Sequence, residues 1–500
     1  MAALRNGRLP LATALVGLLG GLTAAGGAAA TASSAPQRST PRAGVPASPR
    51  LGDLLTYDYD IARSGDDPAD PAIAGLSAAA RWDRHLDGGV YAEPLLDAGS
   101  AYVATENDTL YALNARSGAL RWSLHLGTAV SGSVLHSTPT AGCGDIAPLG
   151  ITGTPAIDPA NNELFVVGEV ELGGHANWRY IRHELFAVSL TSHRVLWKRR
   201  VDPPGGNNPN RYYIGAEQQR SALTVANGHL YVELGGLYGD CGQYHGFVVA
   251  LPESGSGALQ SYQVASAREG AIWATSGATV APGGDLYVAT GNGASSSATD
   301  FDEGNSVIAL SPSLSRLGVW APANWVQLND DDWDLGSGGP VQIPGTSRLF
   351  VAGKPASNGS VGYLLDEQHL GGVGGPAFTG ALCASGGVYG APAVDPTAAG
   401  VLVFAPCGSG TTAVRVAGAS FHLAWRQSSG AANGPPILAG GLVFALDWNG
   451  GALYAMSPTS GRVVLSRPTD ALEHFATPAV GDSMLLVPTQ SGVEGFRALG

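Results

Sequence analysis

The sequence predicts an all-β fold: an eight-bladed β-propeller of four-stranded antiparallel blades, with seven blades as the alternative. Two observations indicate this class. The first is composition, because 72 of the 500 residues are Gly, 32 are Pro and only 13% are charged, which disfavours long solvated helices. The second is an internal repeat of about 40–60 residues, long enough for four short strands, and such periods in strand-rich sequence indicate propeller blades.

Each predicted blade opens with a small residue and a proline, followed by apolar runs that are separated by turns. The opening recurs at residues 92–95, 153–156, 338–341, 390–393, 434–437 and 476–479. Two further units begin near Gln218 and Ala271 without the proline. Together these units predict eight blades.

The turn between the third and fourth strands is the most specific part of the repeat. Residues 112–122 (ALNARSGALRW) contain a small residue, a turn-forming Asn, Ser-Gly and then Trp122. The spacing returns in residues 187–197 and, with Leu465 in place of Trp, in residues 455–465. Asn and Ser side chains close such a turn and Gly accepts its positive φ, while the Trp is expected to fill the gap between neighbouring blades.

The last unit is one strand short, since residues 476–500 contain only three strand-like runs. Near the N-terminus, residues 80–86 (ARWDRHL) resemble the outer strand of residues 120–126 (LRWSLHL) and have no preceding blade of their own. We therefore expect this N-terminal strand to complete the last blade and close the ring, which removes the exposed sheet edges.

The chain is predicted to begin with an export signal. Arg5 and Arg8 precede an apolar run that ends in Ala30-Thr31-Ala32, a small-x-small cleavage pattern, with an uncleaved anchor helix as the alternative. We expect a signal peptide at residues 1–32, a flexible leader at 33–52 and a single propeller domain at 53–500. No later segment has the length and hydrophobicity to span a membrane, so we expect an extracellular or periplasmic protein that is not an integral membrane protein.

Charge and cysteine content narrow the possible partners. The formal net charge is −13 and no basic stripe occurs, so nucleic acid is not an expected partner.

Four cysteines in an exported chain predict two disulfides, with three possible pairings. The absence of a Cys-x-x-Cys motif excludes attached haem and a thiolate zinc site.

The tryptophan-containing turn resembles the docking repeat of the pyrroloquinoline quinone (PQQ) family, Ala-x-Asp-x-x-Thr-Gly-x-x-x-Trp, with Asn or Ser in place of Asp. The repeat covers nearly all of residues 55–500. The family includes quinoprotein alcohol dehydrogenases and also non-catalytic propellers such as the outer-membrane assembly factor. The resemblance therefore implies the fold and leaves the chemistry open.

Residues 273–354 are similar to the cofactor site of the quinoprotein alcohol dehydrogenases. Trp273, Thr-Gly-Asn at 290–292, Trp-Asp at 333–334 and Lys354 follow in the order of that family. The resemblance implies that Trp273 stacks on PQQ, that Asn292 and Asp334 are calcium ligands, and that Lys354 bonds the quinone oxygens. If the protein is a dehydrogenase, the Asp334 carboxylate takes the alcohol proton while calcium polarises the quinone.

Each of these residues also has a purely structural explanation. Trp273 could pack between blades, Asn292 could serve the Gly-Asn-Gly turn, and Asp334 could belong to an acidic solvated loop. Lys354 is harder to explain in this way, because Lys198 and Lys354 are the only lysines in the chain.

The other half of the expected cofactor site departs from the family pattern. Cys143-Gly144 stands where the family has adjacent cysteines, and Cys241 stands where it has a calcium-binding Glu. Asp240, beside it, is the tentative replacement ligand, and His245 occupies the position of a nearby Arg at the mouth of the channel. Calcium usually takes six to eight oxygens, so we expect no cofactor unless the dehydrogenase interpretation holds.

The resemblance also suggests the disulfide pairing. Cys383 and Cys407 flank what are predicted to be successive strands of one region. The resemblance places Cys143 and Cys241 around the mouth of the central funnel, so the expected pairs are Cys143–Cys241 and Cys383–Cys407. The first bond is expected to cross the volume that PQQ and its metal would need.

Two functions are compatible with the sequence. The first is an exported scaffold with a degenerate quinone site, whose small-molecule or protein partner binds at the central channel near Trp273, Asp240, His245 and Asp334. The alternative is a PQQ- and calcium-dependent alcohol dehydrogenase with Asp334 as the general base.

Overall fold

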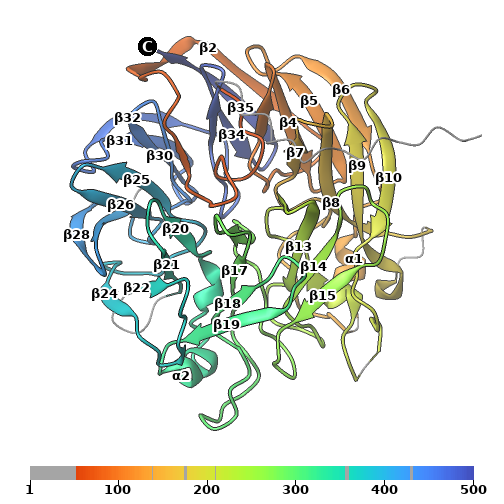
Figure 1. Cartoon of the computed structure of the whole chain (residues 1–500). Helices are drawn as coiled ribbons and strands as arrows, with labels where there is room; N and C mark the ends of the chain where they lie inside the picture. The colour runs from red at the N-terminus through yellow and green to blue at the C-terminus, as the bar shows by residue number, and fades with distance from the viewer. Residues whose placement is uncertain (1–51, 138, 174–176, 209, 355–359, 428–431) are drawn as a thin grey trace, which may run out of the picture. The chain divides into compact units, whose positions relative to one another are not determined.

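In the computed structural model, the described part of the chain is nearly all β and consists of residues 52–137, 139–173, 177–208, 210–354, 360–427 and 432–500 (Figure 1). The described residues all belong to one compact unit. The predicted signal peptide at 1–32, and the predicted leader up to residue 51, lie outside the described residues. None of the helices in the described ranges has the length and apolar character needed to cross a membrane.

Eight sheets are arranged as the blades of a ring, which confirms the eight-bladed fold over the seven-bladed alternative (Figure 1). Blade one contains β3 (Leu95–Asp97), β4 (Ser100–Thr105), β5 (Thr109–Asn114) and β6 (Leu120–His125). Blade two contains β7 (Ala156–Asp158), β8 (Glu163–Glu171), β9 (Ile181–Ser189) and β10 (Arg194–Arg200). Blade three contains β11 (Glu217–Gln218), β12 (Thr224–Ala226), β13 (His229–Gly236), β14 (Phe247–Pro252) and β15 (Gln260–Gln263). Blade four contains β16 (Thr279–Val280), β17 (Leu286–Ala289), β18 (Val307–Leu310) and β19 (Arg316–Ala321), with β23 (Gly372–Val373) parallel to β19.

The second half of the ring repeats this antiparallel pattern. Blade five contains β20 (Val341–Ile343), β21 (Arg348–Ala352), β22 (Val361–Asp366) and β24 (Phe378–Ala381). Blade six contains β25 (Ala393–Thr397), β26 (Gly400–Ala405), β27 (Thr412–Ala417) and β28 (Ser420–Arg426). Blade seven contains β29 (Ile437–Ala439), β30 (Leu442–Asp447), β31 (Ala452–Met456) and β32 (Val463–Pro468), with β1 (Asp66–Asp67) parallel to β29. Blade eight contains β33 (Ala479–Gly481), β34 (Met484–Thr489), β35 (Gly492–Leu499) and β2 (Gly75–His85).

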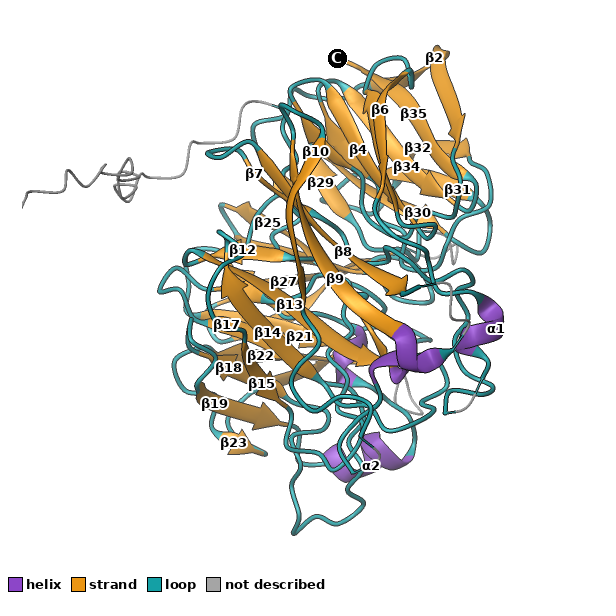
Figure 2. Cartoon of the chain, turned by 90° about the vertical axis from the view of Figure 1, so that its right-hand side faces the viewer, coloured by secondary structure: helices purple, strands orange, loops and turns teal. Residues whose placement is uncertain are grey.

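The short helices of the described residues lie in loops. Two are α-helical, α1 (Gly132–Leu135) and α2 (Trp325–Asp330), and both belong to connections between blades (Figure 2). Three 3-10 turns complete the set: η1 (Trp178–Tyr180), η2 (Ile214–Ala216) and η3 (Leu335–Ser337).

The repeated proline marks the start of a blade. In six blades it directly precedes the first strand, as Pro94 precedes β3 and Pro478 precedes β33. Proline is tolerated there because its missing N–H removes no hydrogen bond between strands. Blade four differs from the prediction, because its first strand begins at Thr279 rather than near Ala271. A turn that includes Gly277, with φ +67°, precedes this strand, and the residues before the turn form a loop.

Where the outer strand carries a Trp, this side chain can dock its blade onto the next, as the sequence predicts and as Trp82 and Trp425 show. Trp82 of blade eight donates from Nε1 to the Ala115 carbonyl at 3.1 Å. A Cβ at Gly118 would lie 2.5 Å from the ring of Trp82, so only Gly fits this turn. Trp425 of blade six contacts blade seven in the same way, with a 2.8 Å bond to the Pro458 carbonyl.

The ring closes through the N-terminal strand, which confirms that prediction. β2 pairs antiparallel with β35, with Trp82 opposite Gly495. A 2.8 Å ion pair joins Arg81 of β2 to Glu494 of β35. The last blade therefore combines strands from both ends of the described chain.

Residues 54–67, here called the central segment, cross the middle of the ring before β2 begins (Figure 1). No pattern in the sequence predicted this segment. Its backbone bonds to the first strands of six blades through the pairs Leu54–Leu96, Leu55–Ile157, Ile61–Val280, Ala62–Gln342, Ser64–Val394 and Gly65–Leu438. Side chains reach the other two blades, since Arg63 bonds Thr224 and Tyr59 bonds the Val480 carbonyl. The central segment thus ties all eight blades together.

Candidate functional site

A cavity of about 590 Å³ is formed by loops at one end of the blades. Its wall contains six aromatic rings: Tyr238, Tyr244, Trp273, Tyr389, Trp448 and Phe475. It also contains four carboxylates and two cations: Asp145, Asp240, Asp332, Asp334, Arg220 and Lys354. Such a mixture of aromatic surface with a few polar groups is typical of a small-molecule site.

The structure brings together the four residues that the family resemblance singles out. The Nζ atom of Lys354 lies 2.6 Å from Asp334 Oδ2 and 2.8 Å from Asp332 Oδ1. The same Nζ lies 5.7 Å from the centre of a Trp273 ring, within range of a cation–π interaction. The backbone N–H of Asn292 donates to Asp334 Oδ1 at 2.5 Å.

Asp334 and Lys354 form a nearly buried ion pair. Burial raises the pKa of Asp334, and the Lys354 ammonium opposes this rise. Burial alone would lower the pKa of Lys354, but Asp334 and Asp332 raise it above its ordinary value. Lys354 is therefore charged at neutral pH and held in place by two carboxylates.

The amide group of Asn292 is used within the protein. Its Nδ2 donates to Asp332 Oδ1 at 2.8 Å, and its Oδ1 accepts from Asn305 Nδ2 at 3.1 Å. Asn305 also accepts from the backbone N–H of Leu335 at 2.7 Å. Asn292 and Asn305 thus fix the loop that carries Asp334, and no sequence motif pointed to Asn305.

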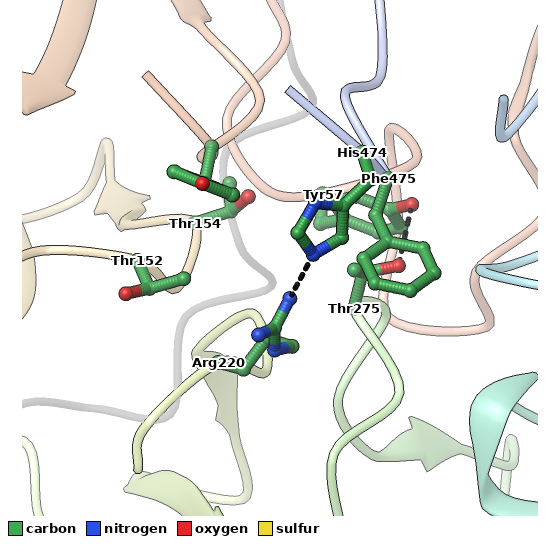
Figure 3. Close-up of a pocket in the computed structure, with 8 residues that line it drawn as sticks. Tyr57, Thr152, Thr154, Arg220, Thr275, His474 and Phe475 are labelled. Carbon is green, nitrogen blue, oxygen red and sulfur yellow. Dashed lines mark hydrogen bonds between the residues drawn. The ribbon is translucent and has the colours of Figure 1, made fainter. Parts of the chain in front are cut away.

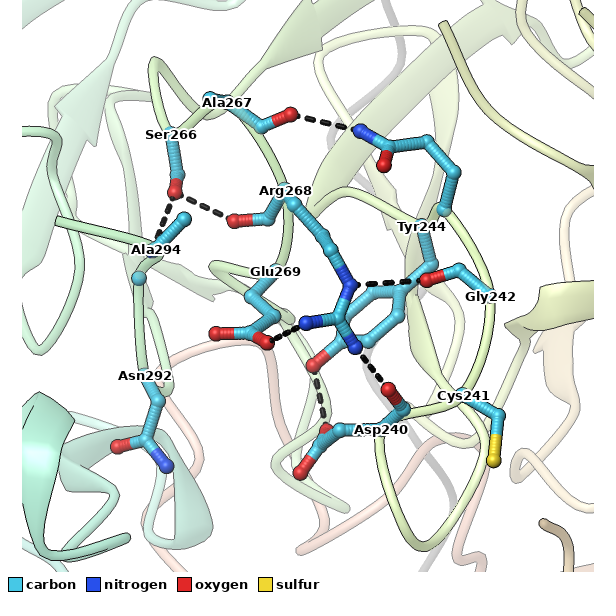
Figure 4. A network of polar contacts seen from close by, with 12 residues as sticks. Asp240, Cys241, Gly242, Tyr244, Ser266, Ala267, Arg268, Glu269, Asn292 and Ala294 are labelled. Carbon is cyan, nitrogen blue, oxygen red and sulfur yellow. Dashed lines mark hydrogen bonds and ion pairs between the residues drawn. The ribbon is translucent and has the colours of Figure 1, made fainter. Parts of the chain in front are cut away.

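Asp240 lies on the cavity wall in a loop that Arg268 holds (Figure 4). The Tyr244 hydroxyl donates to Asp240 Oδ1 at 2.5 Å. Arg268 donates to the Gly242 carbonyl at 2.9 Å, and also to the Asp240 carbonyl and the Glu269 carboxylate. The guanidinium therefore fixes the loop and leaves the Asp240 side chain facing the cavity.

His245 does not line the cavity, although the family resemblance placed it at the mouth of the channel. It is buried. Its ring nitrogens lie 3.1 Å from the Ser266 carbonyl and 2.9 Å from the Arg211 carbonyl. These two interior contacts hold the ring away from the mouth of the channel, and burial lowers its pKa.

The disulfides are Cys143–Cys241 and Cys383–Cys407, which confirms both predicted pairs. The expectation that the first would cross the cavity is wrong, because neither of its cysteines lines the cavity. Cys143 is only 2% exposed and packs in an apolar cluster with Val134 and Leu135. The sulfur of Cys143 lies close to Gly239, which does line the cavity. The disulfide therefore lies behind the cavity wall and packs against it.

Phe475 is the centre of an aromatic cluster that sequence reasoning missed. Its ring lies 5.3 Å from Trp448, 5.9 Å from Trp273 and 6.0 Å from Tyr389, measured between ring centres. Phe475 has φ +65°, a left-handed conformation that is costly for a bulky residue and is found most often at functional sites. The four rings come from separate loops, so no local pattern could have linked them.

A small space next to the cavity is lined by Tyr57 of the central segment (Figure 3). Arg220, His474 and Phe475 line both the cavity and this small space, whose volume is about 10 Å³. The Tyr57 hydroxyl lies 3.2 Å from Thr275 Oγ1 and 3.1 Å from Thr477 Oγ1. The space has room for about one water.

The cavity carboxylates do not fit calcium. Both Asp334 oxygens and the Asn292 amide oxygen already accept hydrogen bonds or ion pairs from the protein. Among the residues that the structure describes, three His, Cys, Asp or Glu ligand atoms lie within 4.8 Å of one another only at Asp83, His85 and Asp470, none of which lines the cavity. Calcium usually needs six to eight convergent oxygens, and this donor set does not supply them.

A buried carboxyl group between blades one and two makes stability depend on pH. Glu106 is 3% exposed, and one of its oxygens accepts from the Gly150 N–H at 2.8 Å. Burial raises its pKa to about 8, from an ordinary value of 4.5. Between these pH values the unfolded chain has lost the proton that the folded protein keeps, so stability falls as pH rises from about 4.5 to about 8.

We therefore expect Glu106→Gln to stabilise the protein at pH 8 but not at pH 4.5. The Gln oxygen can still accept from Gly150 and cannot ionise, which removes a cost on the order of 2–4 kcal/mol at pH 8. Urea unfolding at several pH values measures this, with the exposed Asp331→Asn as the control. A variant whose stability follows the wild-type pH curve would contradict the assignment.

Fold and tryptophan docking together define the class of this protein: it is a PQQ-repeat β-propeller. Residues 70–342 match the profile of the family described as outer membrane protein assembly factor BamB, and the chain belongs to this family. No match was found among curated proteins.

Solved structures with a similar fold include quinoprotein dehydrogenases. A quinohemoprotein alcohol dehydrogenase from Pseudomonas putida HK5 has a TM-score of 0.64 and 14% identity, with 89% of this chain and 80% of that chain covered. The quinohemoprotein alcohol dehydrogenase of Comamonas testosteroni has a TM-score of 0.62 and 15% identity, with 89% and 80% covered. A europium-containing methanol dehydrogenase has a TM-score of 0.60 and 13% identity, with 90% and 98% covered. At these identities the likeness concerns the fold alone.

Proposed function

We propose that this protein is an exported propeller that binds a small organic ligand in its cavity and performs no quinone-dependent oxidation. Export is supported by the predicted signal peptide at residues 1–32 and by two disulfides, which are typical of oxidising compartments. The cavity supports a small-molecule ligand, because its wall combines aromatic rings with a few polar groups.

The observation that carries the proposal is the charge of the cavity wall. Four carboxylates face two cations, and Lys354 is already paired with two of those carboxylates. PQQ carries three carboxylates of its own, so this wall repels it unless a metal ion compensates the charge. The donor set around Asp334 and Asn292 does not supply such a metal site.

A second candidate is a PQQ- and calcium-dependent alcohol dehydrogenase. It is favoured by the proximity of Trp273, Asn292, Asp334 and Lys354 in one wall of the cavity. In that case Trp273 would hold the quinone plane, Lys354 would bond its oxygens and Asp334 would accept the alcohol proton.

A single experiment separates the two candidates. The purified protein is incubated with PQQ and calcium chloride, desalted and assayed for bound PQQ and for ethanol-dependent dye reduction. We expect neither stoichiometric PQQ nor ethanol-dependent reduction, and the same result for Asp334→Ala. Stoichiometric PQQ uptake with dye reduction that Asp334→Ala abolishes would establish the dehydrogenase instead.

A further inference from the structure

Both protein cations in the cavity lie over aromatic rings. Lys354 Nζ is 5.7 Å from the ring centre of Trp273, and the Arg220 guanidinium carbon is 5.4 Å from that of Phe475. The faces of aromatic rings attract cations through the negative charge of their π-systems. Two of the four clustered rings are thus already used by the protein itself.

The other two clustered rings have no such partner. In the described ranges, neither Tyr389 nor Trp448 has a lysine or arginine over its face. Both are half-buried residues of the cavity wall, with ring centres 6.2 Å apart. They offer aromatic surface to whatever occupies the cavity.

The wall also carries an excess of negative charge. Asp145, Asp240, Asp332 and Asp334 outnumber Arg220 and Lys354. His474 does not correct the balance at neutral pH, because burial and the neighbouring Arg220 lower its pKa to about 4. Asp240 bonds the Tyr244 hydroxyl and has no ion pair within the described chain.

From these two features we infer that the cavity binds an organic ammonium ion, held against the faces of Tyr389 and Trp448 and balanced by the carboxylates of the wall. The inference rests on the proposed small-molecule function and names its ligand class. A positive charge uses the aromatic faces and the carboxylate excess together. A neutral sugar ring would stack on the same faces but would make no use of the excess charge.

The test compares two probes of the same shape. Choline carries a quaternary ammonium, whereas 3,3-dimethyl-1-butanol has a neutral carbon in its place. In calorimetric titration of the full-length protein we expect choline to bind at least about tenfold more tightly than the neutral probe, and glucose not to bind. Raising the salt concentration is expected to weaken choline binding, because the carboxylates contribute through charge.

Two variants locate the site. Trp448→Leu is expected to weaken choline binding about tenfold, and Tyr389→Leu provides a second measurement if Trp448→Leu does not fold. Trp178→Leu is the matched control, since Trp178 is half-buried but does not line the cavity, and it is expected to bind choline like the wild type.

The outcomes separate this inference from the proposed function. Equal binding of choline and the neutral probe, binding of glucose alone, or no choline binding at millimolar concentration would each overturn the ammonium assignment and leave the proposed function standing. PQQ-dependent ethanol oxidation would instead overturn the proposed function. Choline binding that survives both Trp448→Leu and Tyr389→Leu would overturn the site.

Discussion

A chain that begins at Gly89 is expected to yield no folded protein. Such a chain lacks β2, so blade eight loses its outer strand and leaves β35 as an open edge. It also lacks the central segment, whose bonds reach all eight blades. The combined loss exceeds the ~5–15 kcal/mol that stabilises a typical domain, and an open edge favours aggregation.

Two longer chains separate the contributions of the two parts. A chain that begins at Gly75 keeps β2 and lacks the central segment, so we expect a soluble ring with a much lower melting temperature. A chain that begins at Gly52 keeps every contact described above and is expected to melt like the full-length protein. Calorimetric melting of the three chains checks the series. Unchanged melting of the chain that begins at Gly89 would reject ring closure by β2.

The blades could be predicted because their information is local and repeated. The proline before a first strand, the turn built on Asn or Ser and the following Trp recur in several of the blades, and each has a local structural reason. The closing strand could be predicted for the same reason, since residues 80–86 repeat the pattern of an outer strand. Trp273, Asn292, Asp334 and Lys354 were found differently: the repeat does not distinguish them, and only the resemblance to the quinoprotein alcohol dehydrogenases pointed to them.

The central segment and the aromatic cluster could not be predicted in this way. Residues 54–67 repeat nothing, and their partners lie in blades that are up to several hundred residues away in sequence. Phe475, Trp448 and Tyr389 meet only because three separate loops reach the same cavity. The position of the Cys143–Cys241 bond depended on how the loop before blade two folds, and that loop packs into an apolar cluster rather than over the cavity.

Arg63 is the charged residue on which the central segment depends. It is fully buried, and its guanidinium donates to Thr224 Oγ1 at 2.7 Å, to the Tyr57 carbonyl at 3.0 Å and to the Ala278 carbonyl at 3.3 Å. Burial lowers the pKa of Arg63, while the carboxylates of Asp58 and Glu233 oppose this shift. The planar guanidinium of arginine has five N–H donors, so it can satisfy this set of acceptors better than any other side chain.

We expect Arg63→Met to destabilise the protein by about 3–5 kcal/mol, because the substitution leaves buried acceptors and two buried carboxyl groups without their cation. Arg63→Lys keeps the positive charge but not the planar guanidinium. We therefore expect it to destabilise the protein less than Arg63→Met does. Arg116→Met, at an exposed position, is the control and should change stability by less than about 0.5 kcal/mol. Urea midpoints with an unchanged m-value measure all three. A loss below about 1 kcal/mol for Arg63→Met would mean that the guanidinium is replaceable by packing alone, and that the backbone bonds of the central segment, rather than its buried charge, hold this segment in place.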